Sequence, residues 1–491
     1  MIANSECRTE PKTGSQTQKV KNDKTNRSIK QAKSVQRETH VTSREMDFFS
    51  QKELVNQTGH SRDEWLQVFL KETIDNALDA CDDNDIPPLI EIRVHETGIS
   101  VSDNGVGIPQ STVDAVLDFT VRASSREAYV SPDRGAQGNA LMTLATMPYV
   151  VDPLNGYLEV ISNGHRRRIK VSDDAITQRP QIHQDVDEIA NHAGTTIAIH
   201  WKAVNSDVPF GCPVFTSAGW LCEGDIEVGC RQLIDGFRLF NPHASINLEW
   251  FGDRDTWQAT NTEWKKWKPS KPSSAHWYDV EHLKRLLAAC ITSDRDRGED
   301  RTVNDFLLQF DGLSGSRKRT QVLDECNMQR VCLSDFVADG QIVEQRIERL
   351  LNAMQKETKA VTPKRLGVIG EDHFREYLSR FDVEPESFNY AKKLKHDDDS
   401  GLPYVIETAF GYRGQSAKRT ILPGVNWSAA IKNPFRSFGA TGEGLDSYLS
   451  ELYAGSHEPI VFAVHLAHPR IQYTDRGKSA LSLSGTNGGE V

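Results

Sequence analysis

The sequence lacks any apolar run that could cross a membrane, since none approaches the ~20 residues that a spanning helix requires. Its N-terminus is polar and charged, without the apolar core of a signal peptide. These two absences argue against a membrane protein and against a secreted one. They predict a cytoplasmic location. The sequence also contains no internal repeat.

Clustered cysteines are missing as well. The eight cysteines are scattered along the chain, and no group of them has the spacing of metal ligands. This distribution predicts reduced, structural thiols in a reducing compartment rather than a zinc site or a disulfide framework. The residues are Cys7, Cys81, Cys212, Cys222, Cys230, Cys290, Cys326 and Cys332.

A net positive charge is absent over most of the chain, where acidic residues outnumber basic ones. The net charge of −11 argues against a protein coated in nucleic acid. Residues 1–46 are the exception, because they hold ten Lys or Arg against five Asp or Glu and almost no large apolar groups. We expect this segment to be a disordered basic tail. It is either a solvated leader or a nonspecific contact for DNA phosphates.

A polar stripe runs along an otherwise apolar helix. The apolar spacing predicts a helix over residues 64–81. Within it, Glu72, Asn76 and Asp79 lie at positions i, i+4 and i+7 and therefore share one face. Buried carboxylates are costly unless something uses them. The stripe therefore requires a ligand or a charge partner.

A second run, VSDNGVGIP at residues 101–109, ends a short strand in an acid and then supplies two glycines. The carboxylate of Asp103 could accept a hydrogen bond from an exocyclic amine such as that of adenine. Gly105 and Gly107 allow the backbone to approach a base closely and to adopt positive φ. Together with the polar stripe, this chemistry predicts a nucleotide site.

The stripe itself suits the phosphate end of a nucleotide. Glu72 is placed to deprotonate a water beside a terminal phosphate, because a partly desolvated carboxylate can have its pKa raised toward the range of a general base. Asn76 offers a neutral oxygen suited to Mg²⁺. The run RGAQGNAL at 134–141 then supplies backbone N–H groups at the start of a helix, which is an anion site. Gly194-Thr-Thr196 follows on a strand.

The order of elements predicts an α+β fold, in which a helical layer covers one face of a mixed sheet. Residues 253–275 are polar and rich in Lys, Ser and Pro, so we expect a surface connection there. Helices are predicted at 64–81, 111–119, 226–240, 279–291, 302–310, 316–326 and 341–356. Strands are predicted at 89–95, 98–102, 157–162, 166–172, 195–202, 244–250, 404–411 and 459–466, with a turn at Asn163-Gly164.

Residues 264–271 interleave tryptophans with lysines. This pattern is consistent with stacking on bases and neutralising phosphates. A surface linker of the same composition is an equally good interpretation.

At these motifs the chain resembles the GHKL (Bergerat) ATPases, the fold shared by gyrase-type topoisomerases, Hsp90, MutL and histidine kinases. The form KETIDNALDA at 71–80 with RGAQG at 134–138 is most similar to the B-type chains of topoisomerase VI. The resemblance implies that Glu72 is the general base, that Asn76 ligates Mg²⁺ and that Asp103 contacts adenine. Ala140 stands where the family usually has a third glycine.

The resemblance also implies the other nucleotide contacts. Ser125 and Arg126 match a Ser-Lys pair near the nucleotide, and Lys478 falls where the family sends a lysine into the ATP pocket, where it can sense the γ-phosphate. The residues implied to bind the nucleotide are Asn76, Asp103, Gly107, Ser125, Arg126, Gly135, Ala136, Gln137, Gly138, Asn139, Ala140, Leu141, Met142 and Thr195.

The resemblance continues beyond the ATPase motifs. Matching runs are NPHA at 241–244, LGVIGE at 366–371, ETAFGY at 407–412, VNW at 425–427 and VHL at 464–466. These runs imply a helical helix–two-turns–helix insert and an α/β transducer domain. The expected organisation is a basic tail at 1–46, a GHKL ATPase domain at 47–225, a linking segment and helical insert at 226–370, a transducer domain at 371–482 and a flexible tail at 483–491.

The family implies an ATP- and Mg²⁺-dependent homodimer that clamps duplex DNA nonspecifically for strand passage. Cutting would belong to a separate A-type subunit, because this chain shows no tyrosine cleavage domain. The location would then be cytoplasmic and nucleoid-associated. In the family a long helix follows the transducer lysine, whereas the 13 residues after Lys478 show no helical pattern. The alternative is therefore a stand-alone, ATP-gated DNA clamp or scaffold without topoisomerase activity.

Overall fold

The computed structural model describes residues 49–117, 128–134, 140–174, 179–190, 192–201, 225–268, 270–414, 418–436, 444–474 and 480–482. The predicted tails at 1–46 and 483–491 lie outside these ranges. Among the described residues, no helix combines the length and the apolar character needed to cross a membrane.

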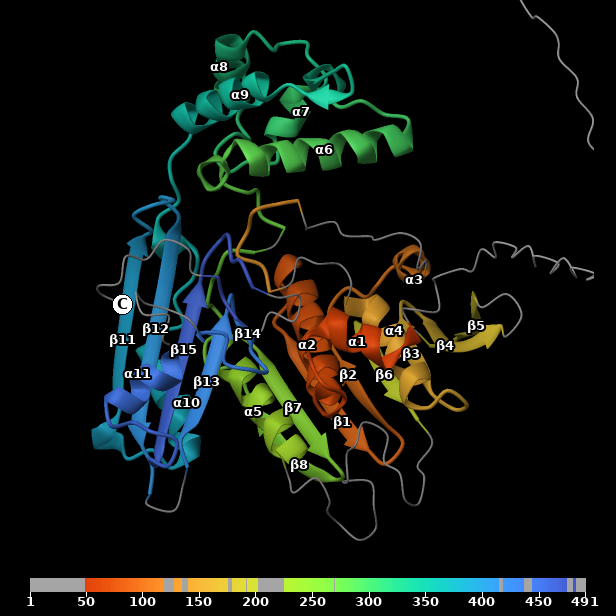
Figure 1. The fold of residues 1–491 in the computed structure, drawn as a ribbon, viewed down its shortest axis with the longest axis vertical. Coiled ribbons are helices and arrows are strands. Elements are labelled where there is room, and N and C mark those ends of the chain that lie inside the picture. The colour runs from red at the N-terminus through yellow and green to blue at the C-terminus, as the bar shows by residue number, and fades with distance from the viewer. Residues whose placement is uncertain are drawn as a thin grey trace, which may run out of the picture. The chain divides into compact units, whose positions relative to one another are not determined.

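An eight-stranded mixed sheet forms the N-terminal half of the described chain (Figure 1). Its strand order is β5-β4-β3-β6-β2-β1-β7-β8, and all neighbours are antiparallel except β1 and β7, which pair in parallel. The strands are β1 Leu89–His95, β2 Gly98–Ser102, β3 Tyr157–Ser162, β4 His165–Asp174, β5 Arg179–Glu188, β6 Thr195–His200, β7 Ser245–Trp250 and β8 Asp253–Trp257.

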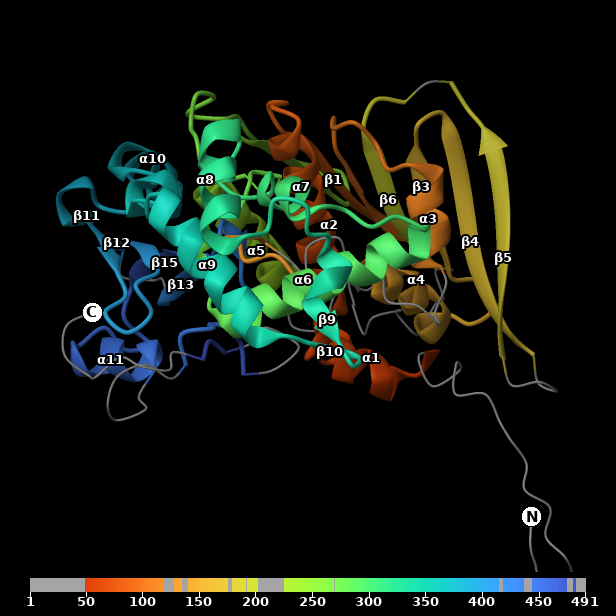
Figure 2. The same ribbon diagram turned by 90° about the horizontal axis from the view of Figure 1, so that it is seen from above.

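Helices cover one face of this sheet (Figure 2). They are α1 Gln51–Thr58, α2 Trp65–Asp83, α3 Gln110–Val116, α4 Ala140–Val151 and α5 Asp225–Phe240. Helix α2 is the central one, and its apolar side is fully buried through residues such as Trp65, Phe69 and Leu78. The expected layer of helices on a mixed sheet is therefore confirmed. Figure 2 also shows how β4 and β5 form the outer end of the sheet.

Residues 280–357 form the helical insert. It consists of α6 Val280–Arg297, α7 Val303–Leu307, α8 Ser316–Cys326 and α9 Glu344–Glu357, with a small ladder of β9 Val337–Ala338 and β10 Gln341–Ile342. Buried leucines and phenylalanines, among them Leu287, Phe306 and Leu350, make its interior. All four predicted helices are present.

A five-stranded mixed sheet follows, in the order β11-β12-β15-β13-β14. The strands are β11 Asn389–His396, β12 Pro403–Tyr412, β13 Thr420–Val425, β14 Ser428–Ala429 and β15 Ile460–Ala467, and the helices are α10 Glu371–Leu378 and α11 Leu445–Glu451. Helix α5 packs against β13 and β14. The contact is tight, because a side chain on Gly424 would lie 2.4 Å from the ring of Phe240.

The predicted surface connection at 253–275 is wrong. Residues 253–257 form β8 at the edge of the first sheet, and Trp267 is fully buried. The first sheet thus extends beyond residue 225. Strands β8, β13 and β14 were not predicted, nor were β5 and β11, whose exposed, charged sequences lack an alternating apolar face. Charged side chains at an edge discourage pairing with other chains.

Candidate functional site

Helix α2 presents Glu72 and Asn76 at the rim of the buried layer. The residues between them, Thr73, Ile74 and Asp75, are buried, whereas Glu72 is half-buried and Asn76 is exposed. The amphipathic spacing thus leaves Glu72 and Asn76 accessible, about one turn apart, whereas Asp79, the third residue of the predicted stripe, is buried. These accessible side chains can contact a ligand while α2 stays folded.

Asp103 lies in the loop that follows β2 and is held in a fixed orientation. Its Oδ1 accepts hydrogen bonds from the N–H of Gly105 at 2.8 Å and of Thr195 at 3.2 Å, while its own N–H donates to the carbonyl of Thr195 at 2.9 Å. Burial raises the pKa of the Asp103 carboxyl, against the lowering effect of those two N–H donors. Thr195 is buried directly beside it.

Two glycines make this geometry possible. Gly194 has φ +78°, and a side chain there would lie 1.9 Å from the carbonyl oxygen of Asp103. Gly107 has φ +83°, and a side chain there would lie 2.5 Å from Oδ1 of Asn163. Both positions therefore require glycine for space as well as for backbone conformation.

The acidic loop and the polar stripe of α2 are close to one another. A side chain on Gly105 would lie 3.4 Å from Cβ of Ala80 and 3.6 Å from Sγ of Cys81, one turn beyond Asn76 on α2. The pKa of the Cys81 thiol is raised to about 12, by burial and by the nearby carboxylates of Asp103 and Asp82. The structure thus brings together the two motifs that the sequence predicted to share a site.

The phosphate-loop residues are only partly described. Leu141 and Met142 lie half-buried in the first turn of α4, which begins at Ala140 and contacts α2. The other predicted site residues lie outside the described ranges: Ser125, Arg126, Gly135, Ala136, Gln137, Gly138, Asn139 and Lys478.

Asp79, the third member of the stripe, has a charge partner inside the protein. Nη1 of Arg134 donates to Oδ1 of Asp79 at 2.6 Å and to Oδ2 of Asp82 at 2.7 Å, and Nη2 donates to Oδ1 of Asn241 at 2.6 Å. The Arg134 side chain is completely buried. Its guanidinium therefore ties the start of the glycine-rich loop to α2.

Arg134 opens the glycine-rich motif, but the motif alone predicts no role for its side chain. The sequence signal that could have indicated this role is the pair Asp79 and Asp82, which lie at i and i+3 on an apolar helix and require a cation. Lys266 also reaches this cluster, with Nζ 2.9 Å from Oδ2 of Asp82. Burial alone would raise the pKa of Asp82, but Lys266 and Arg134 hold it well below its usual range.

Base stacking, one of the two interpretations left open for residues 264–271, does not fit the structure. Trp267 is fully buried and packs on Trp277 with ring centroids 4.7 Å apart. Trp264 is partly buried, and its Nε1 donates to the carbonyl of Val368 at 2.7 Å. The ammonium of Lys266 is committed to Asp82. These aromatic rings therefore pack within the protein and are not free to stack on bases.

Two buried histidines predict acid sensitivity. Burial lowers the pKa of His465 to about 3 and that of His373 to about 4, so both are neutral in the folded state at pH 7. In the unfolded chain they bind protons below about pH 6.5. The free energy of unfolding should therefore fall from pH 6.5 toward pH 4, by up to about 1.4 kcal/mol per pH unit for each histidine.

Urea unfolding at a series of pH values measures this effect. His465→Gln, whose amide oxygen can still accept from the N–H of Trp427, should reduce the slope of stability against pH. The control His457→Gln changes an exposed histidine and should leave the slope as it is. Equal slopes for His465→Gln and the unmodified chain would refute the assignment.

Residues 62–204 match the family model described as histidine kinase-, DNA gyrase B-, and HSP90-like ATPase. Over most of its length the chain is also similar to curated proteins that are named as the B component of type 2 DNA topoisomerase 6. The Metallosphaera sedula protein is 20% identical over 460 residues, which cover 84% of this chain and 75% of that protein. The Archaeoglobus fulgidus protein is 23% identical over 436 residues, covering 84% and 66%.

The Methanococcoides burtonii protein is 23% identical, and the alignment covers 84% of this chain and 64% of that protein. The chain thus spans about two-thirds to three-quarters of these relatives. Among solved structures, the ATPase region of Saccharomyces cerevisiae topoisomerase II has 11% identity and a TM-score of 0.37, covering 84% of this chain and 76% of that one. The Aquifex aeolicus MutL ATPase domain with ADP has 12% identity and a TM-score of 0.28, covering 81% and 89%.

Proposed function

We propose that this chain, which carries a GHKL-type ATPase domain and is similar over most of its length to the B-type chains of topoisomerase VI, is the ATP-hydrolysing subunit of a type IIB DNA topoisomerase. One observation carries the ATP assignment. The carboxylate of Asp103, oriented by two backbone N–H groups, lies in a loop that contacts α2 at Ala80 and Cys81, further along the helix that presents Glu72 and Asn76.

ATP fits between these two motifs with its base at Asp103. Oδ1 of Asp103 is occupied by N–H donors, so Oδ2 is the oxygen that accepts from the adenine amine. Gly107 and Thr195 line the same end. The triphosphate extends along α2 toward residues 135–142, where the N–H groups of the first turn of α4 suit an anion.

Hydrolysis then falls to Glu72. Its carboxylate accepts a proton from a water as the water oxygen bonds to the γ-phosphorus, and the bond from that phosphorus to the bridging oxygen breaks to release ADP. Lys478 contacts the γ-phosphate and loses this contact after hydrolysis. Ser125 and Arg126 approach the nucleotide from the neighbouring loop.

Mg²⁺ suits the exposed amide of Asn76. The amide oxygen is a hard, neutral ligand, and Mg²⁺ commonly takes one or two protein ligands alongside phosphate oxygens and waters. The ion neutralises charge on the β- and γ-phosphates. Among the described residues no group of three His, Cys, Asp or Glu forms a metal site of its own.

The wider function follows from the likeness to the B-type chains of topoisomerase VI. ATP binding would join two copies of the chain into a clamp around duplex DNA, held nonspecifically, at a cytoplasmic, nucleoid-associated location. The ATPase part, the helical insert and the transducer part would act as three units. Strand cutting would belong to an A-type subunit. Relaxation of supercoiled DNA by the two subunits together tests this, and ATP-dependent dimers that never relax DNA would favour the clamp alternative.

Asp103→Asn tests the nucleotide assignment. The amide cannot offer two acceptor oxygens, so either an internal N–H or the adenine amine loses a charge-assisted bond. ATP affinity should fall by about 10- to 100-fold. Titration calorimetry with a non-hydrolysable ATP analogue measures the change. Asp63→Asn, at an exposed position before α2, is the matched control. Unchanged affinity in Asp103→Asn, with the fold retained, would refute the nucleotide assignment.

A further inference from the structure

The turn between β13 and β14, residues 425–428, has an uncommon backbone. Asn426 and Trp427 adopt φ +50° and φ +63°, in the left-handed region. Asparagine tolerates this conformation, but for a bulky residue such as tryptophan it is costly and persists only where the surroundings enforce it. Trp427 is fully buried. The short β13–β14 hairpin therefore has a strained turn, which the surrounding contacts hold in place.

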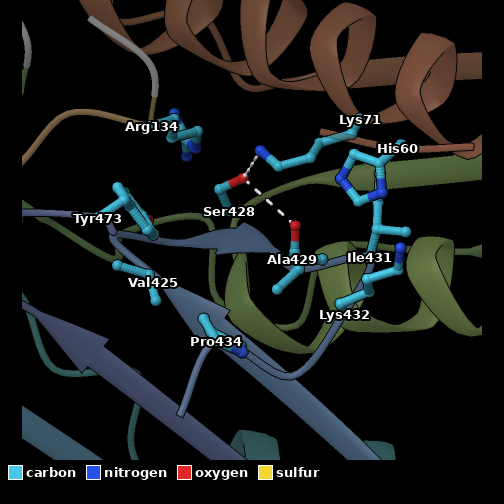
Figure 3. A pocket seen from close by; sticks show the side chains of 11 residues that line it. His60, Lys71, Arg134, Val425, Ser428, Ala429, Ile431, Lys432, Pro434 and Tyr473 are labelled. Atoms are coloured by element: carbon cyan, nitrogen blue, oxygen red, sulfur yellow. Dashed lines mark hydrogen bonds between the residues drawn. The ribbon is translucent and has the colours of Figure 1, made fainter. Parts of the chain in front are cut away.

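The first contact of this turn is with the α2 helix (Figure 3). Oγ of Ser428 donates to Oδ2 of Asp75 at 2.8 Å and accepts from Nζ of Lys71 at 2.7 Å. Lys71 and Asp75 also pair with each other at 2.6 Å. All three side chains are largely buried. A single hydroxyl thus joins the second sheet to two consecutive turns of α2.

These two α2 residues are the immediate neighbours of the proposed catalytic pair. Lys71 precedes Glu72, and Asp75 precedes Asn76. In a helix, adjacent residues are about 100° apart around the axis. One side of the same two turns therefore holds Ser428 while the next side presents Glu72 and Asn76. A displacement of Ser428 would turn or shift both proposed catalytic residues together.

The second contact is with the start of the glycine-rich loop. Nδ2 of Asn426 donates to the carbonyl of Asp133 at 3.2 Å. The carbonyl of Trp427 accepts from Nδ2 of Asn241 at 2.9 Å, and Oδ1 of Asn241 accepts from Arg134 at 2.6 Å. Both residues that precede Gly135 are thus linked to the turn, directly or through one side chain.

The turn is equally fixed to its own sheet. Trp427 donates its N–H to Nε2 of His465 at 3.0 Å, and Oδ1 of Asn426 accepts from the N–H of His468 at 2.9 Å. Tyr473 lines the same small pocket as Lys71 and Ser428 (Figure 3). The surrounding cavity is only about 20 Å³, so the contact is nearly void-free.

We propose that the β13–β14 turn is a positioning element for ATP hydrolysis: through Ser428 it sets the position of Glu72 on α2, and through Asn426 and Trp427 it sets the positions of Asp133 and Arg134, which precede the glycine-rich motif. This inference rests on the proposed ATPase function. The turn would couple the second sheet to the site, in addition to the contact proposed for Lys478. A movement of β13 would therefore reach α2 and the residues before the glycine-rich motif together.

Two mild substitutions test the turn. Ser428→Ala removes the hydroxyl bridge, and Asn426→Gly removes the side-chain contact while tolerating φ +50°. Each should lower kcat by about 10- to 100-fold, as expected for small misplacements of catalytic groups. The affinity for a non-hydrolysable ATP analogue should stay unchanged, while the loss of buried hydrogen bonds should lower the melting temperature by only a few degrees. Ser450→Ala and Asn327→Gly make the same changes at exposed positions, Asn327 also having φ +57°, and should hydrolyse ATP normally.

A second readout follows the coupling itself. In the unmodified chain the ATP analogue should slow amide hydrogen exchange in residues 420–429, and in Ser428→Ala this protection should be lost although the analogue still binds. Normal kcat and normal protection in both variants would overturn the inference while leaving the ATPase proposal intact. Parallel losses of affinity and melting temperature would also overturn it, since they indicate a structural role alone. If the unmodified chain neither binds nor hydrolyses ATP, the proposed function fails first and the inference falls with it.

Discussion

Replacing Glu72 with glutamine should lower the rate of ATP hydrolysis by about 10²- to 10⁴-fold, the range expected when a general base is removed. The glutamine amide keeps the size and most contacts of the carboxylate but cannot accept the proton of the attacking water. ATP binding should persist, because adenine recognition is assigned to Asp103 and phosphate binding to the loop before α4. Phosphate release, measured with excess ATP and Mg²⁺, gives kcat.

The control for this substitution is Glu348→Gln, at an exposed position on α9. It makes the same chemical change on a helix remote in sequence from the site and should hydrolyse ATP at the normal rate. Unaltered hydrolysis in Glu72→Gln would remove the base assignment. Loss of binding together with hydrolysis would instead assign Glu72 to holding the nucleotide.

Replacing Arg134 with methionine should have the largest effect on stability. The substitution leaves the carboxylates of Asp79 and Asp82 buried without their guanidinium partner. Breaking a buried ion pair in this way typically costs about 3–5 kcal/mol. Asp82 keeps Lys266 at 2.9 Å and His243 at 2.7 Å, which limits the loss at that carboxylate. Urea unfolding followed by circular dichroism measures the free energy of unfolding.

The origin of that loss can be checked by a second change. Asp79→Asn, combined with Arg134→Met, removes one of the two buried carboxylate charges that Arg134 contacted and should recover part of the stability. Arg317→Met, at an exposed position on α8, is the matched control and should change stability by less than about 0.5 kcal/mol. A similarly small effect in Arg134→Met would contradict the role of this arginine in holding the loop to α2.

Local sequence patterns were sufficient for most of the fold. Helix α2, the strands β1, β2 and β3, and the four helices of the insert lie close to their predicted ranges. Their apolar periodicity is set by a buried face, and turn residues such as Asn163 and Gly164, at φ +50° and +77°, mark the ends. The sequence also predicted that the loop of Asp103 and the polar stripe of α2 share a site, because a nucleotide needs a contact for its base and another for its phosphates.

Contacts between distant segments were not predictable in the same way. The partners of Arg134 lie more than 50 residues away on either side, and nothing local identifies Asn241 as one of them. Trp267 and Lys266 occur in a hydrophilic stretch, yet both are buried. Trp267 packs on another tryptophan, and Lys266 pairs with a buried carboxylate. The triad Lys71, Asp75 and Ser428 joins residues that only the folded chain brings together.

ATP hydrolysis by the purified full-length chain, with and without duplex DNA, tests the central claim most directly. The expected result is Mg²⁺-dependent release of phosphate that rises when DNA is added and is lost in Glu72→Gln. Absence of phosphate release under both conditions, from a chain that is folded by circular dichroism, would contradict the assignment of this protein as an ATP-hydrolysing subunit.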